Sequence, residues 1–265
     1  MQPIRIILLI LFFCFSAINY SQPNAERIKL EIVYQMGLIT LPTGEIEFSS
    51  YTKYLKSKPL ICMEANFKSE KNFEIFYKYN SYCQANIDIQ NNQIKNFIRK
   101  VNQNGEVFEE NYYFDTDRKL IYSNILQNDL SAKQDTLAFQ KEIFDFLTAG
   151  NFIRHLKFES LKPGQRIPFN ILIDKNLYSL YIKYLGVERV NLPNRNSYVC
   201  YKITLQVLEG NVFKGGEAIT AWISADAKRL PIQCEAKILV GSVKATLADV
   251  EYPSNLELTL SSNKE

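Results

Sequence analysis

The sequence predicts a mainly β fold, in which a curved antiparallel sheet or an open β-barrel carries one longer helix and one short helix. Three observations support this prediction. Apolar residues alternate with polar residues along many short segments, turn-forming residues separate those segments, and the 16 Tyr and 17 Phe concentrate in the segments rather than in a basic patch. A period of two gives a strand one buried face and one solvated face.

The first strand signal stands in RIKLEIVYQMG, residues 27–37, where Leu30, Ile32, Tyr34 and Met36 alternate with mostly polar residues. Similar segments recur along the chain, and we expect a meander of antiparallel strands. Turns between strands are predicted at Pro42-Thr43-Gly44, Asn104-Gly105 and Asp174-Lys175-Asn176. Asn-Gly is the most specific of these signals, because a tight hairpin turn needs positive φ at both central residues.

Two interruptions have helical character. Apolar residues from Phe139 to Ile153 roughly follow a 3.6-residue period, which predicts a helix over about 139–155, although Gly150 weakens it. A shorter helix is predicted over about 70–78. The segment LKPGQRIPF, residues 161–169, then turns the chain into a second group of strands. No linker divides the chain, so residues 22–265 are expected to form a single domain, with a split near 128–136 as the alternative.

The N-terminus has the pattern of a secretory signal peptide, predicted over residues 1–21. Arg5 precedes an apolar run that continues to Phe15 and ends in small and polar residues near Ser21. This run is too short for a bilayer-spanning helix, which needs about 20 residues. We therefore expect an exported protein, in the periplasm of a Gram-negative bacterium or secreted, with no transmembrane segment after signal cleavage.

Charge and cysteine content exclude some functions. The 31 Lys and Arg against 28 Asp and Glu give a net charge of +3 without a basic block, which argues against nucleic acid as a partner. Beyond the signal segment stand Cys62, Cys83, Cys200 and Cys234, none in CxxC spacing. Buried free thiols are the favoured interpretation, because a chain of this size can bury a large core. A single structural disulfide is the alternative, with Cys62 and Cys83 as the first candidate pair.

No catalytic constellation is present. His155 is the single histidine, which disfavours His-rich metal sites and Ser-His or Cys-His relays, and a partly exposed or capping role is expected for it. The Asp115 and Asp117 pair lies in a stretch that lacks the glycine and the terminal Glu of a calcium loop, so it predicts a turn. We expect no catalytic, cofactor-binding or metal-binding residues and no enzymatic activity. A carboxylate-based hydrolase is the third-ranked alternative.

The second half of the chain carries a family resemblance. The order FDFLTAGNFIRHL, LKPGQRIPF, YIKYLGVERV and the strands around AWISADAKRLPIQCEAKILVGSV resembles the domain-of-unknown-function 3108 family of exported bacterial proteins, over about residues 26–252. The best-matching positions are Asp145, Arg154, Lys162-Pro163-Gly164, Trp222, Asp226, Arg229, Pro231 and Gly241-Ser242-Val243. That family has no assigned activity, so the resemblance implies a fold without a reaction.

The hairpin around Asp226 also resembles, locally, one in periplasmic lipoprotein-localisation carriers, which implies a curved sheet with an apolar concavity. A structural hairpin is the favoured interpretation, since Asp226 can accept hydrogen bonds from a turn and Pro231 suits the first residue of the returning strand. The alternative is a ligand groove covered by Trp222, with Arg229 beside it. Asp145 and Arg154 are predicted to form a structural helix pair, through an intrahelical or a helix-to-sheet contact.

These observations favour a non-enzymatic exported module that binds or carries an apolar ligand or an envelope component. Its expected partners are an apolar small molecule or lipid, or an envelope protein, and a groove of about 300–1,000 Å³ would suit the ligand. The alternative is a structural or assembly protein of the cell envelope that acts through protein-protein contacts.

Overall fold

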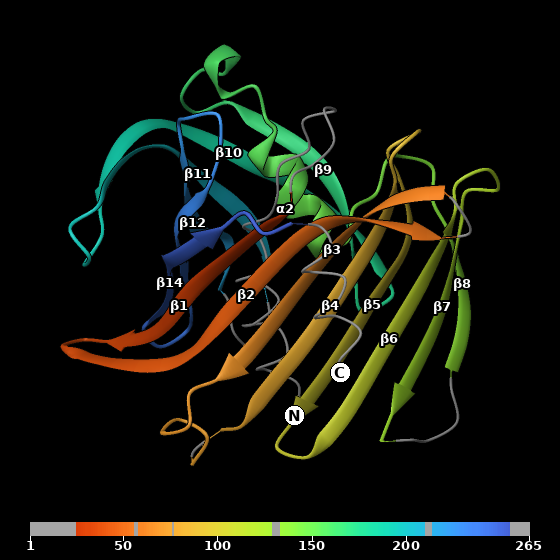
Figure 1. Cartoon of the computed structure of the whole chain (residues 1–265), viewed down its shortest axis with the longest axis horizontal. Helices are drawn as coiled ribbons and strands as arrows, with labels where there is room; N and C mark the ends of the chain where they lie inside the picture. The colour runs from red at the N-terminus through yellow and green to blue at the C-terminus, as the bar shows by residue number, and fades with distance from the viewer. Residues whose placement is uncertain (1–24, 56–57, 76, 129–132, 210–213, 255–265) are drawn as a thin grey trace.

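The computed structural model describes residues 25–55, 58–75, 77–128, 133–209 and 214–254, so the predicted signal segment lies outside the described residues. The described strands form one continuous 14-stranded antiparallel sheet that curls around a central helix (Figure 1). Its strand order is β8-β7-β6-β5-β4-β3-β2-β1-β14-β13-β12-β11-β10-β9. The predicted mainly β class with a curved antiparallel sheet is therefore confirmed.

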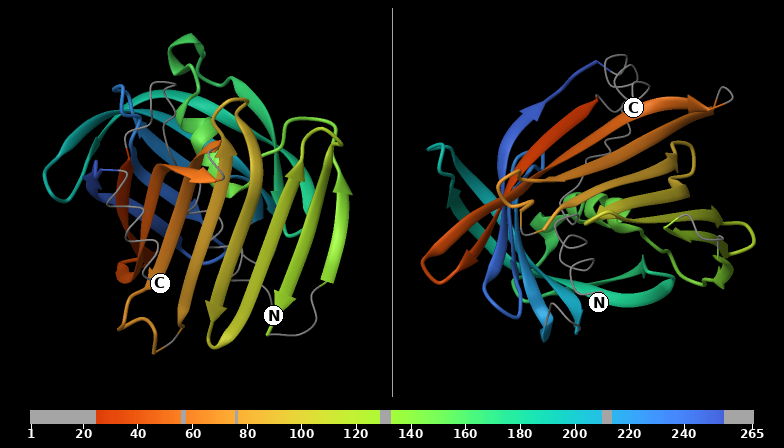
Figure 2. Two further views of the ribbon diagram at one scale, coloured as in Figure 1. Left: turned by 45° about the vertical axis from the view of Figure 1, so that its right-hand side comes forward. Right: turned by 90° about the horizontal axis from the view of Figure 1, so that it is seen from below.

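The sheet has two halves that meet where β1 pairs with β14. The first half contains β1 (Glu26–Met36), β2 (Ile39–Leu55), β3 (Lys58–Ser69), β4 (Tyr79–Asp88), β5 (Gln93–Gln103), β6 (Glu106–Asp115), β7 (Leu120–Gln127) and β8 (Lys133–Ala138). The second half contains β9 (Arg166–Ile173), β10 (Asn176–Asn191), β11 (Ser197–Glu209), β12 (Lys214–Ser224), β13 (Pro231–Lys237) and β14 (Ser242–Glu251). Seen from below, the two halves lie on different sides of the helix α2 (Phe146–Arg154) (Figure 2).

Two of the predicted turns are confirmed. Asn104 and Gly105 have positive φ and join β5 to β6, and Asp174 and Lys175, also at positive φ, join β9 to β10. The predicted turn at 42–44 is wrong, because these residues continue β2 and the chain reverses instead at Gly37.

Gly44 has a different role from the one expected. Its Cα lies so close to β3 that an added Cβ would collide with the backbone oxygen of Lys68. Opposite this stretch of β2, the register of β1 shifts between Ile32 and Val33, which is a β-bulge. The glycine therefore permits a close strand approach rather than a turn.

The longer helix is present but shorter than predicted. It begins after Asp145, because the preceding residues hydrogen-bond to β9: the Phe144 N–H donates to the Asn170 carbonyl at 2.9 Å, and the Phe144 carbonyl accepts from the Leu172 N–H at 2.9 Å. The predicted short helix over 70–78 is not formed. Its described residues make isolated turns, such as the bond from the Glu74 N–H to the Glu70 carbonyl at 3.0 Å.

The four described cysteines are buried free thiols, as favoured from the sequence. The candidate disulfide between Cys62 and Cys83 is wrong, and the strand register explains why. Cys83 on β4 pairs with Ala65 on β3, three residues from Cys62. Since side chains alternate along a strand, Cys62 and Cys83 point to opposite faces of the sheet. Burial raises the pKa of Cys62 to about 12, which keeps its thiol protonated.

Candidate functional site

A cavity of about 390 Å³ lies beside α2, between the helix, the segment that precedes it and the ends of β4, β5 and β6. Its apolar lining consists of Ile87, Ile94, Phe114, Phe139, Ile143, Phe144 and Phe152. Ile87, Ile94 and Phe114 are inward-facing strand residues, placed there by the alternation of each strand. The cavity therefore lies on the concave side of the sheet, where the aromatic-rich core continues into an unfilled space.

One side of this cavity is polar because three helical residues share a face. Thr148, Asn151 and His155 follow each other at three- and four-residue spacing along α2 and its C-cap. The Nδ1 of His155 lies 2.8 Å from the Asn151 carbonyl oxygen, and partial loss of hydration lowers the pKa of the imidazole. The Asn151 Oδ1 is buried and accepts no hydrogen bond from any residue that the structure describes. A ligand with a polar group could supply that donor.

The rim of the cavity carries a cation. Lys119, in the turn between β6 and β7, places its ammonium 5.6 Å from the centroid of the Phe139 ring. The Phe139 N–H donates to the Lys119 carbonyl at 3.0 Å, which fixes this turn against the segment before α2. Glu142 is the only carboxylate among the described lining residues, whereas glycosidase-type hydrolysis uses two facing carboxylates. The geometry suits binding of an apolar chain with a polar end.

Asp145 fixes the start of α2 beside this cavity. Its Oδ1 accepts hydrogen bonds from the Leu147 N–H at 2.7 Å and the Thr148 N–H at 3.0 Å, and the Thr148 hydroxyl accepts from the Asp145 N–H at 3.0 Å. This reciprocal arrangement is a capping box. Because the carboxyl is fully buried, loss of hydration raises its pKa to about 6, although the capping hydrogen bonds oppose that shift.

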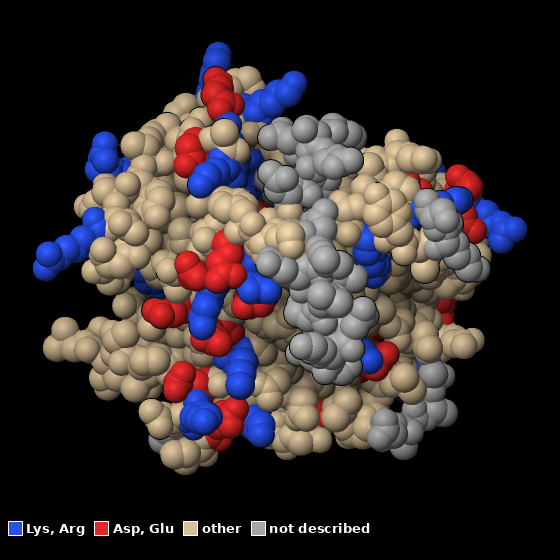
Figure 3. Space-filling view, in the orientation of Figure 1, with Lys and Arg blue, Asp and Glu red and all other residues tan. Residues whose placement is uncertain are grey.

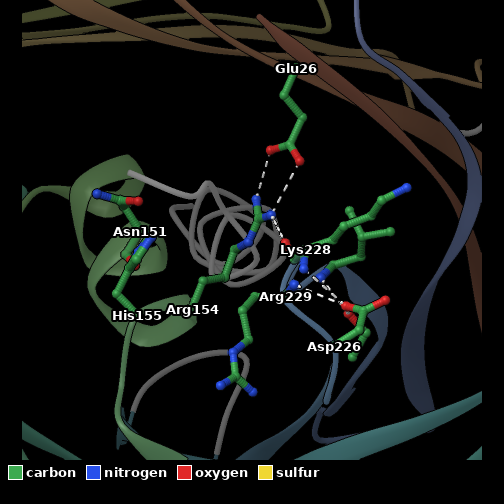
Figure 4. A network of polar contacts seen from close by, with 9 residues as sticks. Glu26, Asn151, Arg154, His155, Asp226, Lys228 and Arg229 are labelled. Carbon is green, nitrogen blue, oxygen red and sulfur yellow. Dashed lines mark hydrogen bonds and ion pairs between the residues drawn. The ribbon is translucent and has the colours of Figure 1, made fainter. Parts of the chain in front are cut away.

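Arg154 fixes the other end of the helix. Its guanidinium donates to both carboxylate oxygens of Glu26 on β1, at 3.0 and 3.3 Å, and to the Lys228 carbonyl at 2.8 Å. Figure 4 shows Arg154 reaching toward Glu26, with Asn151 and His155 on the other side of the helix. Arg154 thus makes a helix-to-sheet contact, whereas Asp145 makes an intrahelical one. The structure does not bring the two together, since nine residues of helix span about 13 Å.

The hairpin between β12 and β13 contains a turn that is stabilised by hydrogen bonds to one side chain. Asp226 accepts hydrogen bonds from the Ser224 hydroxyl at 2.6 Å, the Lys228 N–H at 3.1 Å and the Arg229 N–H at 3.2 Å. The backbone of Arg229 has a φ of 51°, and Pro231 begins the returning strand, as predicted.

The Arg229 side chain links this turn to the segment after α2. Its guanidinium pairs with Glu159 and lies 4.5 Å from the centroid of the Tyr201 ring. The Glu159 carboxylate also accepts a hydrogen bond from the Tyr201 hydroxyl at 2.9 Å. The pKa of Glu159 is lowered to about 2. The largest cause is a hydrogen bond with the backbone of Glu159 itself, and the hydrogen bonds from Arg229 and Tyr201 follow.

Trp222 stands apart from the cavity. It alternates with the inward-facing Ala221 and Ile223 on β12, and the Lys202 ammonium lies 5.2 Å from its ring centroid. It is not among the residues that line the cavity beside α2. The residues that do line it come from five separate segments, so no local motif marks them. The only sequence signal for them is the apolar series that contains Phe139, Ile143 and Phe152.

Two further observations concern metal ligands and helix length. Among the described residues, no group of three or more His, Cys, Asp or Glu side chains is placed to hold a metal ion. No helix within those residues is long and apolar enough to cross a bilayer.

Comparisons with known proteins identify a family and a protein of similar fold. A family model described as "Protein of unknown function (DUF3108)" matches residues 31–248. A search of curated proteins found no match. Among solved structures, a β-barrel-like protein of the domain of unknown function DUF1849 from Brucella abortus is similar, with a TM-score of 0.55 at 7% identity. The similarity covers 88% of this chain and 99% of that chain, and at this identity it shows the fold alone.

Proposed function

We propose that this chain, which belongs to the DUF3108 family of proteins of unknown function, is a non-enzymatic binding module for an elongated apolar ligand with a polar end. The observation that carries the proposal is the cavity beside α2. Its volume of about 390 Å³ falls within the range of about 300–1,000 Å³ for small-molecule sites. The signal-like N-terminus supports an exported location, where the ligand would be a lipid or another envelope component.

The distribution of polarity around the cavity favours an amphiphile. Seven aliphatic and aromatic side chains can cover an apolar chain, and each buried methylene contributes about 0.8 kcal/mol. Asn151 offers an acceptor without a described donor, and Lys119 offers a cation at the rim. A carboxylate or phosphate end would therefore be placed beside Lys119.

Native mass spectrometry of protein purified without detergent, followed by organic extraction, tests the proposal directly. Titration with fluorescent dodecanoic acid then measures affinity for a defined probe. We expect Ile94→Trp to lower that affinity at least about tenfold, because the larger side chain occupies the cavity. Val187→Trp, at an exposed position of β10, is the matched control.

A second pair of measurements isolates the polar end. Lys119→Gln should weaken binding of dodecanoic acid several-fold and leave dodecanol unaffected, because only the acid carries a charge. The cavity would be excluded as the ligand site if no bound molecule were found and if Ile94→Trp bound the probe as tightly as the native protein does.

A second candidate function is assembly with an envelope protein, favoured by an apolar tip at one end of the sheet. Large apolar side chains there are exposed at the β1–β2 turn and the β13–β14 turn: Met36, Leu38, Ile39, Leu41, Leu239 and Val240. The Tyr34 hydroxyl donates to the Val240 carbonyl at 3.1 Å, which holds the two turns together. Figure 3 shows the projecting tip without charged side chains. Such a contiguous apolar surface is typical of an interaction site.

Crosslinking in isolated envelopes tests this candidate. Leu38→Asp should abolish a crosslinked partner, because it places a charge at the centre of the apolar tip, while Val187→Asp should leave the partner in place. A partner that persists in Leu38→Asp would exclude the tip as its binding surface.

A further inference from the structure

The outer face of β5 to β8 carries an unusual set of neutral polar side chains, which we call the amide face. It comprises Asn96, Asn111, Tyr113, Tyr122, Asn124 and Gln134. The register aligns them in two rows across the strands: Asn111 lies opposite Asn124, which lies opposite Gln134, and Tyr113 lies between Asn96 and Tyr122. These residues line a shallow depression of about 590 Å³.

The same outer surface is different at the other end of this half of the sheet. Over β1 and β2 it carries ion pairs, such as Arg27 with Glu47 at 3.6 Å and Lys29 with Glu45. Figure 3 shows charged side chains gathered over β1 to β3 and fewer of them over β6 and β7. Ion pairs thus keep the outer surface hydrated over β1 and β2. The amide face consists of neutral polar side chains, and an ion pair, Lys100 with Glu109 at 3.1 Å, lies beside it.

Asparagine is also an energetically unfavourable residue within a β-strand. Asn is depleted in β-strands, where Thr, Tyr and other β-branched or aromatic residues fit better. Asn96, Asn111 and Asn124 nevertheless occupy interior positions of three neighbouring strands. Residues that weaken an element at surface positions, where Thr would be soluble and more favourable, are expected at functional sites.

The chemistry of the amide face fits a ligand rich in hydroxyl groups. A side-chain amide both donates and accepts hydrogen bonds, as a sugar hydroxyl does. Tyr113 and Tyr122 are 57% and 37% exposed, and their ring centroids lie 6.3 Å apart at an interplanar angle of 31°. Together they offer an apolar platform with polar tips, onto which the C–H face of a pyranose ring can pack.

Two further observations narrow the class of ligand. The depression contains one charged side chain, Asp135, whose Oδ1 already accepts a hydrogen bond from the Thr136 N–H at 2.8 Å. No Lys or Arg is among the described residues that line the depression, and the cations beside it already have anionic partners. Lys100 pairs with Glu109 at 3.1 Å, and Arg118, which also contacts Tyr122, pairs with Asp115 at 3.8 Å. The depression itself therefore offers no cation for a phosphate or an acidic polymer. The Asn124 Oδ1 is buried and accepts no hydrogen bond from the described residues, so a small rotation would let it accept one from a ligand hydroxyl.

We infer that the amide face binds a neutral polysaccharide. This site lies on the opposite side of the sheet from the cavity beside α2, and it does not depend on the apolar ligand proposed for that cavity. The chain would then contact a glycan with its convex surface and hold a small molecule on its concave side.

Affinity electrophoresis of the purified protein tests the inference, in native gels that contain hydroxyethyl cellulose, galactomannan or dextran, with alginate as the acidic polymer. We expect at least one neutral polymer to retard the protein at physiological salt. The Tyr113→Ala/Tyr122→Ala variant should bind that polymer at least about tenfold more weakly, because both stacking surfaces are lost. Tyr54→Ala, which removes another exposed tyrosine of the same sheet, should bind as the native protein does.

A second variant separates binding from folding. Asn124→Thr should keep or raise the Tm, because Thr is the better strand residue, and should still weaken retardation. The inference would be overturned if none of the neutral polymers retarded the protein, or if alginate retarded it more strongly than any of them. It would also be overturned if the tyrosine variant and Asn124→Thr were both retarded as strongly as the native protein.

Discussion

At the scale of single residues, Asp145 combines two opposing effects. Its carboxylate caps α2, which stabilises the helix by about 1 kcal/mol, but complete burial disfavours the charge. Its pKa therefore rises from 3.8 to about 6 in the folded protein. Between these two pH values the folded state keeps a proton that the unfolded chain has lost. The free energy of unfolding consequently falls as the pH rises through this window and levels off above it.

Asp145→Asn is expected to remove that pH dependence while preserving the cap, since Asn caps as well as Asp. Relative to the native protein, the variant should gain about 2 kcal/mol between pH 4 and pH 7, since the shift of the pKa to about 6 takes most of its effect in this range. Urea unfolding at several pH values measures this difference. Asp145→Ala, which also removes the cap, should be less stable than Asp145→Asn throughout. A constant difference between native protein and Asp145→Asn from pH 4 to 7 would contradict the assignment.

At the scale of elements, α2 is a short helix whose position depends on contacts at its two ends. Nine residues are too few for a stable isolated helix, so tertiary contacts must hold it. Leu147 and Ile153 are fully buried against the concave face, while Arg154 joins the C-terminal end to Glu26 on β1. The side chain of Arg154 is fully buried, and the Glu26 carboxylate compensates its charge.

Glu26→Gln should therefore destabilise the protein by about 3 kcal/mol, because it removes the carboxylate charge that the buried guanidinium contacts. Glu251→Gln is the matched control, since Glu251 pairs at 2.9 Å with Arg27, next along β1, but is half exposed. The control should cost at most about 1 kcal/mol. Chemical denaturation measures both values, and equal costs would show that burial does not govern the Arg154 contact.

At the scale of the whole molecule, a set of polar contacts that we call the clasp joins the two halves of the sheet. Arg99 on the inner face of β5 pairs with Glu110 on β6 at 2.6 Å and with Asp174, in the β9–β10 turn, at 2.7 Å. The Lys175 N–H donates to the Tyr112 hydroxyl at 3.1 Å. Strands that are far apart in the sheet order are thus fixed across the concavity that contains the core.

Asp174→Asn tests the clasp without altering the turn, because Asn also tolerates the φ of 45° at this position. We expect the amides of the β9–β10 turn to exchange faster with solvent, with a loss of about 1–2 kcal/mol in stability. Hydrogen exchange followed by mass spectrometry reports the local effect. Asp115→Asn, which alters a hairpin turn with no such contact among the described residues, is the control. Unchanged exchange at 174–177 would show that the clasp does not hold the halves together.

The cavity beside α2 and the amide face were not predictable from the sequence. His155, Lys119 and Ile94 are far apart along the chain, and only the curl of the sheet brings them to one space. The alignment of Asn111 with Asn124 and Gln134 depends on register, which a single sequence leaves open. By contrast, the Asp226 turn and the start of β13 at Pro231 were predictable, because each depends on residues within a few positions.

The sequence by itself determined the mainly β class, the alternation of buried and exposed faces, and the tight turns at Asn104-Gly105 and Asp174-Lys175. These features follow from local backbone preferences and a period of two. Only the tertiary structure decided that residues before Asp145 pair with β9 instead of joining the helix, and that Cys62 and Cys83 face opposite sides. The reason is that hydrogen bonds and register between distant strands override a local preference of less than about 1 kcal/mol per residue.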